Sequence, residues 1–183
     1  MVRIIAFVGA PASGKTEAAD VAREEGIPVV VMGDVIREEL HRRGLPLSDE
    51  NAGRVASELR AREGMDAIAR RCIPKIKRAL RYSDVVVIDG IRGIAEVEAL
   101  KREFGGDFLL VCIDAPLEIR YERILKRGRG DDALSIEEFM RREARENAWG
   151  MREAMRNADI VVRNNCSLEE FRRRIKEIID SNV

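Results

Sequence analysis

Short runs of continuously apolar residues alternate along the chain with longer segments of helical spacing. The apolar runs occupy residues 3–8, 27–32, 84–89, 108–114 and 158–163. Apolar residues recur every three or four positions in segments 14–25, 65–81, 94–104, 117–126, 136–156 and 168–179. An apolar run without alternation is typical of a strand buried on both faces. The pattern therefore predicts an α/β fold in three layers, a five-stranded parallel sheet with helices on both faces and ligands at the carboxyl ends of the strands.

Two stretches interrupt this alternation. Residues 34–64 are polar and helix-prone, and Leu45-Pro46-Leu47-Ser48 predicts a break into two helices, with Ser48 or Asp49 capping the second. Residues 127–132 (RGRGDD) form a glycine-broken charged turn between two helices. We expect a single domain over residues 1–183, in which 34–64 is a helical insertion and 127–146 is a short lid.

Composition limits the partners of this domain. Lys+Arg and Asp+Glu both number 33, so the chain lacks the basic excess of a general nucleic-acid binder. Arginine supplies 27 of the 33 positive charges, and arginine can bind phosphates through two parallel hydrogen bonds. The count leaves the oligomeric state open.

The cysteines and the apolar runs bear on location. Cys72, Cys112 and Cys166 are odd in number and widely spaced, which argues against a disulfide framework and a zinc site and predicts reduced packing residues. No apolar run approaches the length of a membrane span, and the first is too short for a signal peptide. We expect a cytoplasmic protein.

The first apolar run leads into the most specific motif of the chain. Residues Gly9-Ala10-Pro11-Ala12-Ser13-Gly14-Lys15-Thr16 match the phosphate-loop pattern G-x-x-x-x-G-K-[ST], between an expected strand and an expected helix. Loop amides and the helix N-terminus would hold phosphates, Lys15 would add a positive charge, and the Thr16 hydroxyl would ligate Mg²⁺. This context predicts a P-loop NTPase fold that binds ATP and Mg²⁺. The alternative is a glycine-rich turn that matches by chance.

Three further residues lie at the ends of expected strands. Asp89 ends the third strand beside the loop and is the candidate second metal residue; the alternative is a solvated strand-end aspartate. Arg37 follows the second strand and Arg92 the third. Two arginines at the same rim indicate an anionic acceptor, most simply a phosphate monoester.

These segments resemble the adenylate kinase group of nucleoside monophosphate kinases. The matching residues are Gly33, Asp34 and Arg37 of a G-D-x-x-R stretch, then Asp89, Gly90 and Arg92 of a D-G-x-R stretch. The resemblance implies that Asp34, Arg37 and Arg92 bind the acceptor. Met32 stands where the family commonly has a hydroxyl residue, and D-G-I-R lacks the family's proline, which leaves the base pocket open.

The resemblance continues after the fourth strand. Asp114-Ala115-Pro116, then Glu122-Arg123-Ile124 and Arg127, match the family's D-x-P and D/E-R-I segments. They imply that Arg123 stacks on the donor base and Arg127 reaches its phosphates; the alternative is a basic helix facing water, which we expect of Arg120 and Lys126. Arg142 and Arg145, three apart on one helical face, resemble lid arginines that close over the transferring phosphate.

The tail resembles a second family. Residues 158–171, with Asn164 in an A-D-x-V-V-x-N stretch, resemble the closing segment of dephospho-coenzyme A kinase, which implies that Asn164 lies at the nucleotide. As a whole the chain resembles archaeal P-loop kinases related to both families. We assign no role to His41, and we expect Trp149 to pack at the lid hinge, with base stacking as the alternative.

The resemblance implies a kinase that moves the γ-phosphoryl group of Mg-ATP to a nucleoside monophosphate, with AMP or CMP favoured. A dephospho-coenzyme A kinase-like enzyme is the first alternative, and its hydroxyl acceptor would need a carboxylate such as Asp34 as base. The second alternative is an ATP-dependent switch or assembly factor with weak hydrolysis. All three bind small-molecule nucleotides and none requires a membrane.

Overall fold

The computed structural model describes residues 3–127 and 135–182, and its sheet follows the apolar runs. The strands are β1 (Ile4–Val8), β2 (Val29–Val31), β3 (Val86–Ile91), β4 (Phe108–Asp114) and β5 (Ile160–Arg163). They form one sheet in the order β2-β3-β1-β4-β5, and every pairing is parallel. The predicted five-stranded parallel sheet is confirmed.

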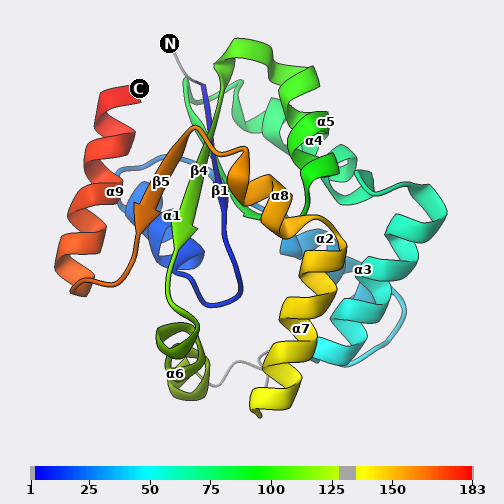
Figure 1. The fold of residues 1–183 in the computed structure, drawn as a ribbon. Helices are drawn as coiled ribbons and strands as arrows, with labels where there is room; N and C mark the ends of the chain where they lie inside the picture. The colour runs from blue at the N-terminus through cyan, green and yellow to red at the C-terminus, as the bar shows by residue number, and fades with distance from the viewer. Residues whose placement is uncertain (1–2, 128–134, 183) are drawn as a thin grey trace.

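Helices cover both faces of this sheet (Figure 1). They are α1 (Lys15–Glu24), α2 (Gly33–Arg42), α3 (Asp49–Glu63), α4 (Ala67–Ala79), α5 (Ile94–Phe104), α6 (Leu117–Arg127), α7 (Ile136–Ala148), α8 (Met151–Arg156) and α9 (Leu168–Asn182), with a short 3₁₀ turn at Gly105–Asp107. Ile5 and Phe7 of β1 pack into a core with α1 and α9, whereas Ile4 and Ala6 pack into a core that includes α2, α4, α5 and α8. Alternate residues of β1 therefore pack against the helices on opposite faces of the sheet.

The central strands bend where they approach the loop. The register of β1 against β3 shifts after Phe7, which lies opposite Asp89, so that Val8 lies opposite Ile91. Gly90 is the extra residue and has a φ of 99°, a conformation that glycine adopts without steric cost. The D-G pair thus forms a bulge within β3, directly after Asp89.

Two predicted helical segments contain breaks. Ser48 caps α3, because its Oγ accepts a hydrogen bond from Asn51 N at 3.1 Å. The single helix expected over 136–156 is wrong: it divides into α7 and α8 at Gly150, whose φ is 95°. A glycine inside a helical pattern does not by itself distinguish a break from a continuous helix.

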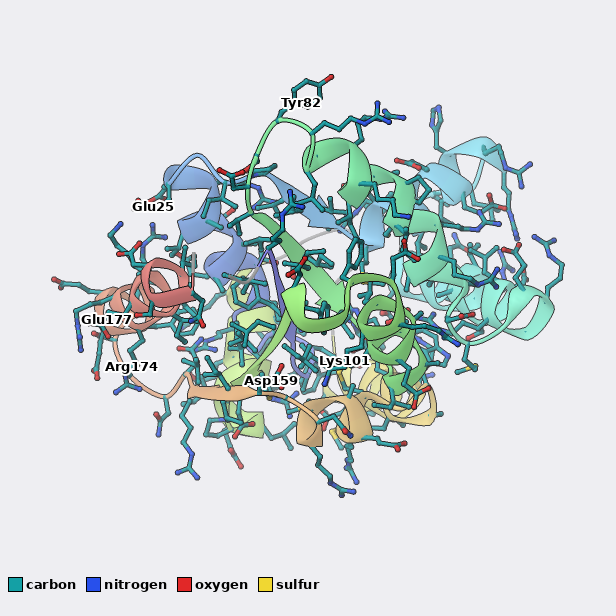
Figure 2. All side chains as sticks on the ribbon, turned by 90° about the horizontal axis from the view of Figure 1, so that it is seen from above. Glu25, Tyr82, Lys101, Asp159, Arg174 and Glu177 are labelled. Atoms are coloured by element: carbon teal, nitrogen blue, oxygen red, sulfur yellow. The ribbon has the colours of Figure 1, made fainter. Side chains whose placement is uncertain are left out.

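The two ends of the sheet differ in what surrounds them. Figure 1 shows α6 and α7 beyond the carboxyl end of β4, whereas the chain termini lie at the opposite end. Figure 2 looks onto that opposite end, where Tyr82 projects from the loop before β3 and is 87% exposed. Within the described residues, every helix falls short of the length and hydrophobicity that a membrane span requires.

Candidate functional site

The loop from Gly9 to Gly14 joins the end of β1 to the start of α1. Ser13 N donates to Ala10 O at 3.1 Å, which closes a tight turn within the loop. The Lys15 side chain folds back over this turn, and its Nζ donates to the carbonyl oxygens of Gly9 at 2.5 Å and Ala10 at 3.0 Å. The first amides of α1 are at the same place, where a helix N-terminus favours an anion.

Lys15 lies in an electrostatic environment suited to an anionic ligand. Burial of its ammonium group, together with the positive charge of Arg92, lowers the pKa of Lys15 to about 7, against the opposing effect of Glu146 and Asp89. A bound phosphate would favour the charged form of the side chain. An anion bound in front of the loop would therefore be stabilised by the Lys15 side chain.

Two side chains from later in the chain hold the loop backbone. The amide Nδ2 of Asn164, which follows β5, donates to Ser13 O at 2.8 Å, and a Cβ built on Gly14 would lie 2.3 Å from this nitrogen. Arg123 on α6 donates to the carbonyls of Ala12 at 3.3 Å and of Ser13 and Asn164 at 3.1 Å. Both predicted nucleotide residues thus contact the loop, and the stacking of Arg123 on a base stays a prediction.

Arg120 corrects an expectation, because it does not face water. The residue is 6% exposed, and its guanidinium group donates to Ala115 O at 3.0 Å and Pro11 O at 3.3 Å. Its NH1 also contacts Glu143 of α7 at 2.8 Å. Arg120 therefore connects α6, the loop and α7, whereas Lys126 on the same helix is exposed as expected.

Thr16 and Asp89 are the residues that could hold Mg²⁺. Both line the cleft in front of the loop, and Asp89 is 6% exposed. Mg²⁺ takes oxygen ligands and commonly combines one or two protein groups with phosphates and water, so a hydroxyl and a carboxylate fit this ion. Among the described residues, no three His, Cys, Asp or Glu side chains form a metal site by themselves. The metal would therefore be held jointly with a nucleotide.

Two cavities meet in front of the loop. The donor cleft, of about 390 Å³, is lined by the loop from Pro11 to Thr16, by Asp89 and by residues after β5. The smaller cavity, of about 80 Å³, lies between α2, α3 and α7, and is called the acceptor pocket after the ligand that we propose for it. Both cavities share five lining residues: Gly33, Arg37, Gly90, Arg92 and Arg142. These shared residues are where two ligands, one in each cavity, would come together.

Each predicted phosphate-binding arginine around this boundary pairs with a carboxylate. Arg37 donates to Asp34 at 2.7 Å, Arg92 contacts Glu146, and Arg142 contacts the same Glu146 at 3.2 Å. Asp34 itself lines neither cavity. The structure thus brings Arg37, Arg92 and Arg142 together and leaves Asp34 beside them as a partner of Arg37.

Arg145 lies on the acceptor side alone. Its NH2 contacts Asp49 at the start of α3 at 2.8 Å, and its guanidinium carbon lies 5.7 Å from the Trp149 ring centroid. Arg60 lies 4.0 Å from the centroid of the same ring. Trp149 packs against the core at the junction of α7 and α8, which confirms its expected packing role; that this junction is a lid hinge stays a prediction.

Sequence reasoning missed three residues of this pocket. Glu146 is 2% exposed, and Arg60 and Glu96 form a buried pair with atoms 2.8 Å apart. Glu96 also accepts hydrogen bonds from the amides of Arg92 and Gly93, at 2.7 and 3.2 Å, which fixes the start of the segment that carries Arg92. Arg142 and Glu146 are four residues apart on one helix, and this spacing could have predicted their ion pair. The Arg60–Glu96 pair joins residues far apart in sequence, so no local spacing predicts it.

The buried polar atoms that lack partners belong to this site. Among the described residues there are four: Ser13 Oγ, Arg60 Nε, Arg145 Nε and Glu146 Oε2. Each belongs to a residue that lines one of the two cavities. Buried polar atoms are usually hydrogen-bonded, so their concentration here marks a place where a ligand or water binds. The Arg127 side chain and residues 128–134 of the predicted lid lie outside the described part of the chain.

Comparisons with known proteins show a family model and curated relatives that are similar to this chain. A family model described as "AAA domain" matches residues 8–140. A "UPF0200 protein" of Methanosarcina mazei is 51% identical over 181 residues, which are 99% of this chain and 96% of that protein. A "UPF0200/UPF0201 protein" of Archaeoglobus fulgidus is 59% identical over 178 residues, which are 97% of this chain. The chain spans about 55% of the length of the Archaeoglobus protein.

Solved structures show the same fold at low identity. The protein TT1252 from Thermus thermophilus is 24% identical with a TM-score of 0.60, and the match covers 98% of this chain and 97% of that one. Dephospho-CoA kinase from Campylobacter jejuni is 14% identical with a TM-score of 0.62, covering 99% and 97%. Shikimate kinase from Acinetobacter baumannii, in complex with shikimate, is 18% identical with a TM-score of 0.57, covering 100% and 95%.

Proposed function

The chain belongs to the UPF0200 family of archaeal P-loop kinase-fold proteins, and from this premise we propose that it transfers the γ-phosphoryl group of Mg-ATP to a nucleoside monophosphate, with AMP or CMP favoured. One observation carries the proposal. Arg92 and Arg142 line both the donor cleft and the acceptor pocket, and both charges act on Lys15 of the loop. A phosphate in each cavity would therefore contact the same two guanidinium groups.

The donor side would position ATP. The loop amides and Lys15 would hold its β- and γ-phosphates, and Thr16 and Asp89 would hold Mg²⁺, which neutralises phosphate charge when bound. Arg123 and Asn164 donate hydrogen bonds to the loop carbonyls of Ala12 and Ser13. These bonds fix the direction of the loop peptides, so that their amide groups would face the phosphates. These contacts bring the γ-phosphoryl group to the boundary between the two cavities.

The acceptor side would supply a nucleophile that is already ionised. A phosphate monoester held by Arg37 and Arg92 presents an anionic oxygen, so its attack requires no general base. Arg127, Arg142 and Arg145 would neutralise charge on the transferring group, Arg145 from the acceptor side. Catalysis would then consist mainly of positioning and charge neutralisation.

The dephospho-coenzyme A kinase-like alternative has one supporting observation. Asn164, from the tail segment that resembles that family, is buried against Ser13 of the loop. A hydroxyl acceptor would need a carboxylate base, and Asp34 is already paired with Arg37 outside both cavities. The arginine-rich boundary without a free carboxylate base therefore favours an acceptor whose phosphate oxygen, and not a hydroxyl group, is the nucleophile.

Product analysis tests the proposal. Purified protein is given Mg²⁺ and ATP with AMP, CMP, dephospho-coenzyme A or no acceptor, and the products are separated by ion-exchange chromatography. We expect the diphosphate from AMP or CMP, with AMP favoured. Phosphorylation of dephospho-coenzyme A alone would favour the dephospho-coenzyme A kinase-like alternative. ATP hydrolysis at the same rate with and without each acceptor would favour the ATP-dependent switch or assembly factor.

Arg92→Ala gives the matching kinetic test. Loss of one charge-assisted contact should raise the KM for the acceptor by roughly ten- to a hundredfold and leave the KM for ATP nearly unchanged. Arg78→Ala, an exposed arginine of α4 that lines neither cavity, is the control. Equal changes in both KM values would place Arg92 outside the acceptor site.

A further inference from the structure

Glu146 is a buried carboxylate of the acceptor pocket, in contact with two arginines that also line the donor cleft. It is 2% exposed and lines the acceptor pocket. Its Oε1 accepts hydrogen bonds from Arg92, which follows β3, and from Arg142 at 3.2 Å, one turn earlier on α7. Glu146 thus binds two of the three arginines that line both cavities, through a single oxygen.

The surrounding charges keep this carboxylate ionised. Burial alone would raise its pKa, but the positive charges of Arg92, Arg142 and Lys15 outweigh burial, so the pKa of Glu146 lies below its usual value. Arg60, which also lines the acceptor pocket, is a further cation in the field of Glu146. A negative charge of the protein therefore lies against the cationic side chains that the two cavities share.

The second oxygen of this carboxylate is poorly satisfied. Oε2 is buried and has no hydrogen-bond partner among the described residues. A buried acceptor without a donor destabilises the arrangement that buries it. A phosphate dianion carries two charges and three free oxygens, so it can engage Arg92 and Arg142 more completely than Glu146 does.

We propose that Glu146 is a specificity-determining residue, which holds Arg92 and Arg142 until a dianionic phosphate group replaces its carboxylate. The inference deepens the proposed function and rests on its acceptor site. A neutral ligand such as water or an uncharged alcohol cannot compete for the two guanidinium groups, because it offers them no charge. Glu146 would thereby restrict binding at Arg92 and Arg142 to ligands that carry a phosphate group.

Glu146→Gln tests the proposal, because it removes the charge and keeps the shape. Full-length protein is saturated with Mg-ADP to fill the loop, and the affinity for inorganic phosphate is measured by calorimetric titration. We expect Glu146→Gln to bind phosphate roughly tenfold more tightly than the wild type, because Arg92 loses the opposite charge of Glu146 and Arg142 keeps the longer contact with Asp49, at 3.6 Å. An additional Arg92→Ala substitution should abolish the gain.

A control separates this effect from a general change of charge. Glu137→Gln removes one exposed carboxylate from the same helix and should leave the phosphate affinity unchanged. An unchanged or weaker affinity in Glu146→Gln would overturn the proposal, since a residue that only positions the arginines would lose binding when altered.

The design separates this proposal from the proposed function. Phosphate binding requires no transfer, so a tenfold gain in a protein without kinase activity would support the role of Glu146 alone. Nucleotide phosphorylation with no gain in Glu146→Gln would reject only the role of Glu146. If Glu146→Gln does not fold, Glu146→Asp keeps the charge but shortens its reach, and a smaller gain in affinity is expected; no gain would reject the proposal.

Discussion

At the scale of single residues, the loop depends on a glycine that no other residue can replace without cost. Gly14 precedes α1 with a φ of 116°, and a Cβ there would lie 2.3 Å from Asn164 Nδ2. That nitrogen donates to Ser13 O, so a side chain at position 14 would displace the contact that holds the loop. The motif glycine therefore serves both the backbone conformation and the close approach of the tail segment.

Gly14→Ala should consequently disturb binding as well as stability. We expect a loss of more than about 1 kcal/mol in the free energy of unfolding, from strain at positive φ and from the displaced Asn164, with a clear loss of Mg-ATP affinity. Gly26→Ala is the matched control, because its φ is 75° and a Cβ there meets nothing within 4 Å. Thermal unfolding and calorimetric titration measure both effects; ATP binding by Gly14→Ala at wild-type affinity would contradict the account.

At the scale of elements, α7 carries side chains for three different partners. Glu143 contacts Arg120 of α6, Arg145 contacts Asp49 of α3, and Glu146 contacts Arg92 after β3. Phe139 anchors the same helix in a small core with Ile124 of α6. Helix α7 therefore links the loop, the acceptor pocket and the boundary between the cavities.

The arginines of α7 should differ in their kinetic effects. Arg142 lines both cavities, so Arg142→Ala should lower kcat by roughly 10³-fold or more with little change in ATP affinity. Arg145 lines the acceptor pocket alone, so Arg145→Ala should lower kcat less and raise the KM for the acceptor. Arg141→Ala is the control, since Arg141 is exposed, lines neither cavity, and donates from its Nε to Glu137 O of its own helix. If Arg142→Ala lost ATP affinity and kept its kcat, Arg142 would contribute to the binding of ATP and not to stabilisation of the transition state.

At the scale of the whole molecule, the predictable part of the structure is local in sequence. Apolar runs such as Ile4–Val8 predict the strands because burial on both faces removes alternation, and the loop motif predicts where phosphates bind. The burial of Arg120 and Glu146 could not be predicted in this way. Both depend on how α6 and α7 pack against the loop, and a polar residue on an amphipathic helix is expected to face water unless its partner is known.

The acceptor pocket is likewise a property of the assembled fold. Its residues come from α2, α3, the segment after β3 and α7, and the Arg60–Glu96 pair joins residues 36 positions apart. The sequence predicted Arg37 and Arg92 because each follows a strand whose carboxyl end faces the loop. The ion pair between Asp49 and Arg145 could not be predicted from the sequence. An aspartate in the first turn of a helix is common because it interacts favourably with the helix dipole, so its presence does not indicate a distant partner.

The central claim is that a donor and an acceptor phosphate meet at Arg92 and Arg142. Calorimetric titration with a bisubstrate analogue, two adenosines joined by five phosphates, tests it most directly. We predict one site per chain, affinity roughly 10²-fold or more above that of ATP, and marked loss of this affinity in both Lys15→Ala and Arg92→Ala. An analogue that binds no more tightly than ATP, or one whose affinity survives Arg92→Ala unchanged, would contradict the account.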